Sequence, residues 1–416
     1  MLASQLERLY ENSMCKVLII GAGHAGGAAA AFLRQFGHEG DIVLVGDEET
    51  PPYQRPPLSK GWLAGTMASA DILLRPASFY SDRAIELRLG VRATTIDRQT
   101  KRVCFSDGSA EPYDHLILAM GSTARRLEVP VQGGRRLLEL RSLQDAARLK
   151  AALEPGKRLA VIGGGYVGLE AAASARALGA EVVVLERMER ILARVASETL
   201  SAFYAARHRL EGVDIRTRVE AASISSGCVT LTNGEDVEAD AVLVGVGASA
   251  CDELARAAGL ECRDGVLVDL EARTSDPGIF AVGDMTCRPM PLYGCMHRLE
   301  SVGNAVEQAK QAAAAITGHP APAGEVPWFW SDQYDLKLQI AGLPFGADRE
   351  VVRGDPARPG FAVFHMKGER IVCVEAVSAA PAFMFGKQMI ARGATVDPVR
   401  LADIETPLKA AAGDQV

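Results

Sequence analysis

Glycine recurs with one spacing in two distant parts of the chain, in the segments GAGHAG (21–26) and GGGYVG (163–168). In the pattern G-x-G-x-x-G, the first glycine permits a tight turn and the second lets backbone N–H groups approach a pyrophosphate, while the third lets a helix lie close to its strand. A helix N-terminus after such a loop stabilises negative charge. Both segments therefore predict phosphate-binding loops. The glycines that fill the pattern are Gly21, Gly23, Gly26, Gly163, Gly165 and Gly168.

The two loops also have similar flanks. Residues 16–49 and 157–190 each begin with a short apolar run, pass through the glycine loop into an alanine-rich stretch, and end in a β-branched run. Continuous apolar strands are typical of parallel sheets that are covered on both faces. A strand before the loop, a helix after it and an acid at the end of the next strand form the context that the motif requires. The sequence thus predicts two βαβ units that each bind a dinucleotide.

Acidic residues end the second strand of each unit, at Asp47 and at Glu186. A carboxylate at this position accepts hydrogen bonds from a ribose diol and repels a 2′-phosphate. Glu186 therefore favours NADH over NADPH, although the neighbouring Arg187 would favour the phosphate. Glu48 competes with Asp47 for the first ribose, and Asp47 is preferred because it lies nearer the strand.

Length and composition place the chain among globular proteins with more than one domain. It has 416 residues, 48% of them hydrophobic and 23% charged, and a domain usually takes about 100–200 residues. The net charge of −7 gives no support for nucleic-acid binding. No apolar run is long enough to predict a membrane span. The N-terminal segment 1–14 contains two Glu and lacks the apolar region of a secretory signal.

The eight cysteines form neither a CxxC motif nor a metal-ligand spacing, so no metal site is expected. Reduced, mostly buried thiols are the simpler interpretation, and they favour a cytoplasmic protein.

The chain beyond the second unit predicts further elements. The segment 274–284 is typical of a strand that ends in an acid, Asp284, and residues 297–316 have the 3- and 4-residue apolar spacing of a helix. That helix would direct its N-terminal donors, near Val302, at a ring that becomes anionic. After a Pro/Gly-rich linker at about 320, alternating apolar runs around KGER (367–370) predict a β-hairpin and a third, α+β domain.

Five segments together carry a family resemblance. They are PPYQRPPLSKGWL (51–63), GGGYVGLE (163–170), TSDPGIFAVGD (274–284), HRLESVGNA (297–305) and PWFWSDQYDLKLQ (327–339). With these segments the chain resembles, from about residue 15 to 410, the NADH-dependent ferredoxin reductases. These are glutathione-reductase-like flavoproteins that serve cytochromes P450 and aromatic-ring dioxygenases. The resemblance implies an α/β fold with two Rossmann-like dinucleotide-binding domains and a C-terminal α+β domain.

The domain boundaries expected from this fold divide the chain into four segments. An FAD-binding domain would comprise residues 1–121 and 250–322, on either side of an NAD-binding domain at 122–249. The α+β domain would follow at 323–416.

The resemblance also implies the site residues. NADH would lie along 163–170 with Glu186 on its ribose, and Glu170 would face Lys60 beside the nicotinamide and the flavin as the catalytic pair. Trp330 is a candidate for covering a flat ring, although buried core tryptophans are common. The residues implied for FAD are Ala25, Asp47, Lys60, Ala93, Arg141, Asp284 and Val302, together with the first glycine loop.

The implied reaction is that of a ferredoxin–NAD(+) reductase, with hydride transfer from the nicotinamide C4 to the flavin N5. Disulfide reductases of this architecture place a redox cysteine pair early in the chain, but no cysteine lies between Cys15 and Cys104. The electrons are therefore expected to leave one at a time for an external carrier, and the resemblance implies that this carrier is a [2Fe–2S] ferredoxin. Such ferredoxins are usually acidic, so a basic docking surface is expected. The protein itself is expected to be a monomer or a weak dimer. The candidate docking residues are Lys310, Lys387, Arg392 and Lys409.

Two other functions fit the same cofactors. One is a signalling flavoprotein resembling apoptosis-inducing factor, in which NADH reduces FAD slowly; the acidic net charge disfavours its nucleic-acid-binding form. The other is a flavin NADH oxidase that yields peroxide. The rate at which NADH reduces a ferredoxin separates the three functions.

Overall fold

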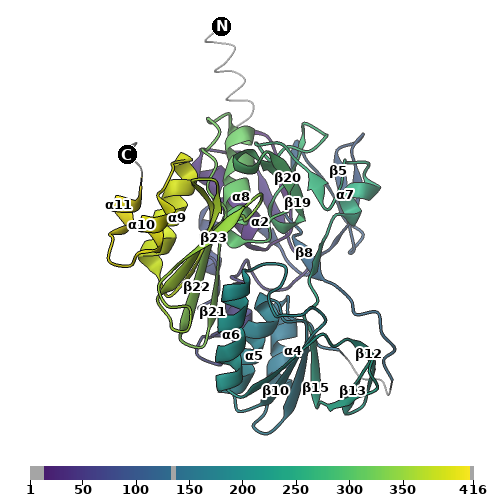
Figure 1. Cartoon of the computed structure of the whole chain (residues 1–416). Coiled ribbons are helices and arrows are strands. Elements are labelled where there is room, and N and C mark those ends of the chain that lie inside the picture. The colour runs from purple at the N-terminus through teal and green to yellow at the C-terminus, as the bar shows by residue number, and fades with distance from the viewer. Residues whose placement is uncertain (1–13, 133–136, 413–416) are drawn as a thin grey trace. The chain divides into compact units, whose positions relative to one another are not determined.

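The computed structural model describes residues 14–132 and 137–412, and the predicted N-terminal extension lies almost wholly outside them. The chain divides into two compact units, each with its own sheets and helices (Figure 1). The first unit comprises residues up to 54, 69–123 and 248–325, and the second comprises 55–68, 124–247 and the chain from 326 onward.

A five-stranded parallel sheet forms the centre of the first unit, in the order β18-β7-β1-β2-β3. Residues at the centre of this sheet are fully buried because helices cover it, which explains the uninterrupted apolar runs. Helix α2 (His24–Gln35) packs against α8 (Val302–Thr317) through alanines such as Ala30 and Ala309, whose small side chains let the two helices approach. The strands are β1 (Val17–Ile20), β2 (Ile42–Val45), β3 (Ile85–Arg88), β7 (His115–Leu118) and β18 (Ile279–Ala281).

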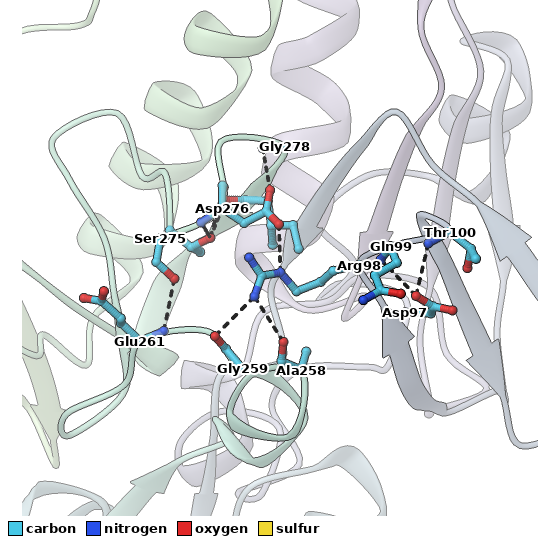
Figure 2. A network of polar contacts seen from close by, with 12 residues as sticks. Asp97, Arg98, Gln99, Thr100, Ala258, Gly259, Glu261, Ser275, Asp276 and Gly278 are labelled. Atoms are coloured by element: carbon cyan, nitrogen blue, oxygen red, sulfur yellow. Dashed lines mark hydrogen bonds and ion pairs between the residues drawn. The ribbon is translucent and has the colours of Figure 1, made fainter.

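A network around Arg98 joins three distant segments of this unit (Figure 2). Arg98 follows β4 (Ala93–Asp97), and its guanidinium donates to the Asp276 carboxylate at 2.8 Å and to the carbonyl of Gly259 at 3.2 Å. That carbonyl lies just after α7 (Glu253–Ala257), where a cation is favourable. Burial alone would raise the pKa of Asp276, but the hydrogen bonds from Arg98 and from the Gly278 N–H outweigh it and lower this pKa.

Smaller elements complete the first unit, and one of them, β8, continues past its boundary at residue 123. They are α3 (Ala77–Asp82), β5 (Arg102–Phe105), β6 (Ala110–Pro112), β8 (Ser122–Ala124), β16 (Ala248–Ala250), β17 (Val266–Leu267), β19 (Thr286–Met290) and β20 (Cys295–His297), with the short 3₁₀ turns η2 (Gly283–Met285) and η3 (Pro291–Tyr293).

The second unit contains a four-stranded parallel sheet in the order β11-β10-β9-β15. Leu169 of helix α5 (Tyr166–Ala177) belongs to the core on one face of this sheet. The other main elements of this part are α4 (Leu143–Ala152), α6 (Glu198–Leu210), β9 (Arg158–Ile162), β10 (Glu181–Glu186), β11 (Val213–Thr217) and β15 (Ala241–Val244). A small antiparallel sheet consists of β12 (Ala221–Ser225), β13 (Cys228–Leu231) and β14 (Asp236–Glu238), and the 3₁₀ turn η1 spans Pro56–Ser59.

The same unit ends in a five-stranded antiparallel sheet, in the order β21-β22-β25-β24-β23. Phe383 and Ile390 of helix α9 pack on one of its faces. The elements are β21 (Trp328–Gln333), β22 (Leu336–Gly342), β23 (Arg349–Arg353), β24 (Phe361–Lys367), β25 (Arg370–Val377), α9 (Ala380–Arg392), α10 (Pro398–Ala402) and α11 (Leu408–Ala411).

The predicted fold class is confirmed: two parallel dinucleotide-type sheets are followed by an antiparallel sheet with helices. The hairpin around KGER is also present, because Lys367 pairs with Arg370 across the turn. The helix expected within 297–316 is present, and its N-terminus lies at Val302 as predicted, because the Ser301 side chain accepts a hydrogen bond from the Asn304 N–H and thereby caps the helix. None of the helices in the described part of the chain has the length and apolar character of a membrane span.

Candidate dinucleotide sites and a buried ion pair

The first glycine loop joins β1 to α2 in the first unit. Gly21 has φ +113°, and a Cβ placed on it would lie 2.3 Å from the Ala119 carbonyl oxygen. A Cβ on Gly26 would lie 1.9 Å from the carbonyl oxygen of Gly21. A Cβ on Gly23, in contrast, would meet nothing within 4 Å. The outer glycines thus serve the turn and the packing, whereas the middle one faces open space.

The second loop, between β9 and α5, repeats this geometry in the second unit. Gly163 has φ +109°, and an added Cβ would lie 2.4 Å from the Gly245 carbonyl oxygen. A Cβ on Gly168 would lie 2.4 Å from the carbonyl oxygen of Gly163, while one on Gly165 would meet nothing within 4 Å. The shared pattern matches the separate roles that the motif gives its three glycines.

The helices that follow these loops begin without a side-chain cap. Gly23 and Gly165 are the N-cap residues of α2 and α5, and neither helix has an acidic residue in its first turn. By comparison, α6 and α8 begin with a serine whose hydroxyl accepts from a backbone N–H, at Ser197 and Ser301. Open N-terminal donors above an uncrowded glycine suit the pyrophosphate of a dinucleotide. The residues of both loops therefore fit FAD and NADH.

The acids at the two strand ends differ in their surroundings. Asp47 is exposed, and one of its carboxylate oxygens lies 3.2 Å from the Arg92 guanidinium. Glu48 accepts a hydrogen bond of 2.7 Å from the Tyr53 hydroxyl. Each acid thus has a polar neighbour, and Asp47 stays the predicted ligand of the first ribose.

Glu186, at the end of β10, is held against its own loop. Its Oε2 accepts from the Gly164 N–H at 2.7 Å, and its Oε1 accepts from the Met188 N–H at 2.8 Å. Arg187 is 73% exposed and lies 3.7 Å from Glu220. The Glu186 carboxylate therefore has a fixed place beside the glycine loop, where it would meet a ribose diol. Arg187, which would favour a 2′-phosphate, lies beside Glu220 instead.

Three predicted FAD segments converge within the first unit. A Cβ placed on Gly283, next to Asp284, would lie 3.2 Å from the Cβ of Ala25 and 3.8 Å from the Cβ of Ala305. Ala305 belongs to the first turn of α8, which begins at Val302. The Asp284 carboxylate also accepts from the Ser122 hydroxyl at 3.2 Å. The first helix end, the acid and the second helix end thus lie together, and Ala93 begins β4 in the same unit.

Lys60 and Glu170 form the predicted ion pair, and both lie in the second unit. The Lys60 Nζ is 2.7 Å from the Glu170 Oε2, with side chains that are 16% and 4% exposed. Glu170 comes from the first half of α5, and Lys60 directly follows the turn η1 in the segment RPPLSK. Two prolines in that turn fix the backbone that presents the lysine. A buried charge is tolerated only when it is paired and hydrogen-bonded, as it is here.

Sequence reasoning did not identify the serines that complete this pair. Ser59 donates to the Glu170 Oε2 at 2.5 Å, and Ser331 of β21 donates to the Oε1 at 2.5 Å. Ser174 donates to the carbonyl of Ser59 at 2.7 Å and holds the turn against α5. The available signal was the alternation in WSDQ (330–333), which puts Ser331 and Gln333 on one face of the strand and Trp330 on the other.

The remaining predicted residues of the second unit are also placed. The Arg141 carbonyl accepts from the Arg55 guanidinium at 2.6 Å, which ties the segment before α4 to RPPLSK. Trp330 stacks on Trp328 with ring centroids 5.4 Å apart. Because side chains alternate along β21, these tryptophans lie on the face opposite Ser331.

No disulfide joins the cysteines, all eight of which the structure describes, and no group of potential ligands able to hold a metal occurs at residues 14–132 and 137–412. Burial raises the pKa of the Cys15 thiol to about 11, with a further contribution from Asp114. A thiol that stays protonated is a poor nucleophile. Cys15 therefore does not resemble a redox cysteine.

The comparisons with known proteins agree over nearly the whole chain. The family described as pyridine nucleotide-disulphide oxidoreductase matches residues 15–309, and the family described as reductase C-terminal matches 328–412. A probable ferredoxin reductase of Castellaniella defragrans is 48% identical over 94% of this chain and 97% of its own. Putidaredoxin reductase of Pseudomonas putida is 40% identical over 96% of this chain and 97% of its own.

Solved structures give the same assignment. The reductase in the crystal structure of the covalent putidaredoxin reductase–putidaredoxin complex superposes with a TM-score of 0.92 at 40% identity, covering 95% of this chain and 97% of that one. The chain therefore belongs to the pyridine nucleotide-disulphide oxidoreductase family, among its ferredoxin reductases.

Proposed function

We propose that this protein is an NADH-dependent ferredoxin reductase with bound FAD, which passes electrons to a [2Fe–2S] ferredoxin of a cytochrome P450 or ring-dioxygenase system. The observation that carries the proposal is the repeated loop geometry: each unit has a glycine loop with an open middle glycine and an uncapped helix N-terminus. Two dinucleotides in one chain point to electron transfer between them. The relatives named above, all ferredoxin reductases, supply the acceptor.

Each unit contributes its own groups to this function. In the first, the loop at 21–26 would bind the FAD pyrophosphate, Asp47 the adenosine ribose, and Asp284 with the α8 N-terminus the far end of the cofactor. In the second, the loop at 163–168 would bind NADH, with Glu186 on its ribose. When bound, the flavin accepts a hydride and releases electrons singly. One NADH would thus reduce two ferredoxin molecules, leaving NAD⁺ and a proton.

Lys60 and Glu170 would orient the reacting groups. Three donors hold the Glu170 carboxylate, so it is fixed in one place and stays an acceptor. The same carboxylate holds the Lys60 ammonium, whose charge would favour the electron-rich reduced state of the reacting ring.

The ferredoxin would dock on basic side chains. Lys387 and Arg392 lie on α9 and Lys409 lies on α11, which contacts α9 in the second unit. The Lys387 ammonium lies 5.4 Å from the Trp328 ring centroid, so the tryptophan pair and the cations share a neighbourhood. Lys310 is exposed on α8 of the first unit. We also propose that the protein is cytoplasmic and a monomer or weak dimer, without affinity for nucleic acid or membranes. Cell fractionation and sedimentation test these properties.

One experiment separates this function from its rivals. The purified protein should be yellow, and under anaerobic conditions NADH should reduce an added [2Fe–2S] ferredoxin through many turnovers. Slow bleaching of the flavin without ferredoxin reduction would support a signalling flavoprotein. Rapid oxygen consumption without any carrier would support an NADH oxidase. A colourless protein that does not bind added FAD would contradict all three.

A further inference from the structure

A hydrogen-bonded chain leads from the Glu170 carboxylate to the turn between β21 and β22 in the second unit. Ser331 donates to Glu170 at 2.5 Å, and Gln333 donates to the Ser331 hydroxyl at 3.1 Å. The Gln333 amide oxygen lies 2.8 Å from His208 Nε2, and the Tyr334 hydroxyl lies 2.9 Å from His208 Nδ1. The first four groups are buried, whereas Tyr334 is half-buried. The chain thus joins α5, β21 and α6 (Figure 1).

The chemistry of the groups fixes the direction of the inner bonds. An ionised carboxylate only accepts, so the Ser331 hydroxyl must give its hydrogen to Glu170. That hydroxyl then accepts from the Gln333 amide NH₂, which turns the amide oxygen toward His208. His208 Nε2 must therefore carry a hydrogen and donate it.

The outer end of the chain follows from the burial of His208. This side chain is fully buried, and burial lowers its pKa to about 4 even though the Gln333 hydrogen bond raises it. The ring is therefore neutral near pH 7, and with Nε2 protonated its Nδ1 has a lone pair. The Tyr334 hydroxyl must donate to it. Every hydrogen bond in the chain points toward Glu170, and aligned bonds of this kind polarise one another.

The backbone at the outer end is strained. Tyr334 stands in the tight turn between β21 and β22, next to the Gln333–Leu336 pair, and has φ +58°. A non-glycine residue in this region is unfavourable and persists where its surroundings determine it. Here the surroundings that hold Tyr334 come from the end of α6. Arg207 pairs with Asp335 at 2.7 Å, and the Arg207 guanidinium lies 5.2 Å from the Tyr334 ring centroid.

We propose that His208 and Tyr334 are positioning residues for Glu170: through Gln333 and Ser331 they orient its carboxylate toward one acceptor geometry. The role rests on the proposed function, in which Glu170 acts with Lys60 in hydride transfer. The alternative is that these bonds only satisfy buried polar groups. In that case removal of one would lower stability without a specific effect on the reaction.

The test removes the outermost donor and compares it with a matched hydroxyl. Tyr334→Phe in the FAD-bound protein should lower the limiting rate of flavin reduction at saturating NADH by about threefold to tenfold, with little change in the NADH dissociation constant. Tyr204→Phe is the control, because Tyr204 lies on the same helix α6 and its buried hydroxyl has no hydrogen-bond partner among the described residues. It should leave the rate unchanged.

A double-mutant comparison tests whether the effect passes through Glu170. In a Glu170→Gln background, Tyr334→Phe should lose most of its effect on the rate. His208→Phe should resemble Tyr334→Phe, whereas His208→Gln, which can accept from the tyrosine and donate to Gln333, should recover the rate. An equal loss in both backgrounds would overturn the proposal, as would a loss confined to NADH affinity or thermal stability.

A spectroscopic readout does not depend on turnover. In ¹⁵N-histidine-labelled protein, with the signal assigned through His208→Gln, His208 should be neutral and protonated at Nε2 from pH 6 to 8. An Nδ1-protonated ring would reverse the chain and refute the proposal. The readouts also separate this inference from the proposed function: if NADH fails to reduce the flavin or the ferredoxin, the proposed function falls, and the tautomer decides whether the oriented chain exists.

Discussion

The Lys60–Glu170 pair combines two charges that the surrounding apolar core would not tolerate singly. Three donors converge on the Glu170 carboxylate, two from RPPLSK and one from β21. Both of its oxygens therefore accept hydrogen bonds. Such a pair adds little stability over an apolar replacement, but the loss of one partner leaves a buried charge.

Lys60→Met should therefore lower the free energy of unfolding by about 3 kcal/mol, measured in urea. The double variant Lys60→Met with Glu170→Gln should recover much of this loss, since no charge remains. Lys150→Met is the control for the loss of a lysine outside this pair and should cost less. The Lys150 ammonium lies 5.1 Å from the Trp62 ring centroid and donates to the Trp62 carbonyl at 3.1 Å. The ion-pair account is wrong if the double variant is as unstable as the sum of the single ones.

Glu186 should determine the choice of coenzyme because two backbone N–H groups fix its carboxylate beside the glycine loop. In Glu186→Ser, the loss of a charged hydrogen bond to the ribose should cost about 1.5–3 kcal/mol, or roughly tenfold to a hundredfold in kcat/KM for NADH. The ratio of NADPH to NADH activity should rise, since the repulsion of a 2′-phosphate is removed and Arg187 remains nearby.

Steady-state kinetics with both coenzymes measure this change. Glu220→Gln is the matched variant: it releases Arg187 from its acid but keeps Glu186, so NADH kinetics should stay unchanged. An unaltered NADPH/NADH ratio in Glu186→Ser would show that another group selects the coenzyme.

At the scale of elements, the two loops separate glycines that shape the fold from glycines that admit a ligand. Gly23 and Gly165 have ordinary extended dihedrals and open space around an added Cβ. Gly23→Ala should therefore keep the unfolding free energy within about 0.5 kcal/mol of the parent but weaken FAD retention, because the methyl group would occupy the path of the pyrophosphate. Gly165→Ala should do the same for NADH affinity.

The third glycine of each loop, Gly26 or Gly168, should give the opposite result. Gly26→Ala and Gly168→Ala would place a Cβ 1.9 Å and 2.4 Å from a backbone carbonyl oxygen, so the helix must move from its strand and the protein should be destabilised by several kcal/mol. Flavin content, NADH titration and urea unfolding on all four variants check the contrast. Equal destabilisation by Gly23→Ala and Gly26→Ala would contradict it.

Local signals explain why the elements were predictable. The apolar run before each loop, the glycines and the acid after the next strand lie within about 30 residues, which is the span of one βαβ unit. The helix N-terminus predicted near Val302 is confirmed, and within the wider segment 297–316 it is the Ser301 cap that marks the first helical residue. Element ends depend on such single hydrogen bonds, which periodicity does not reveal.

At the scale of the whole molecule, the sequence revealed much less of the site. Ser331 reaches Glu170 across 161 positions of sequence. Likewise, the buried carboxylate of Glu375 on β25 accepts from the backbone N–H and the hydroxyl of Ser197 at the start of α6, 178 positions away. No local pattern encodes these pairings, because a serine in a strand or at a helix start is common in any fold. Among these contacts between distant parts of the sequence, the Lys60–Glu170 pair was the one predicted, and that prediction came from the family resemblance.

Buried histidines should make the stability of the second unit depend on pH. Burial holds the pKa of His208 at about 4, below the unfolded value near 6.5. Between these values the unfolded chain binds more protons, so the stability from a neutral His208 is present above pH 6.5 and is lost as the pH falls toward 4. His365 has the opposite sign: Glu375 raises its pKa despite burial, so its contribution is full below pH 6.5 and is lost as the pH rises through the raised pKa.

All three tryptophans, Trp62, Trp328 and Trp330, lie in the second unit, so their fluorescence reports its unfolding. The unfolding free energy in urea should be about 2 kcal/mol lower at pH 5 than at pH 7, from His208 alone. His208→Gln cannot be protonated and should remove most of this difference. The two pH values lie above the range in which carboxylates with a lowered pKa, such as Asp240, titrate. A pH dependence that persists unchanged in His208→Gln would mean that other groups destabilise the unit in acid.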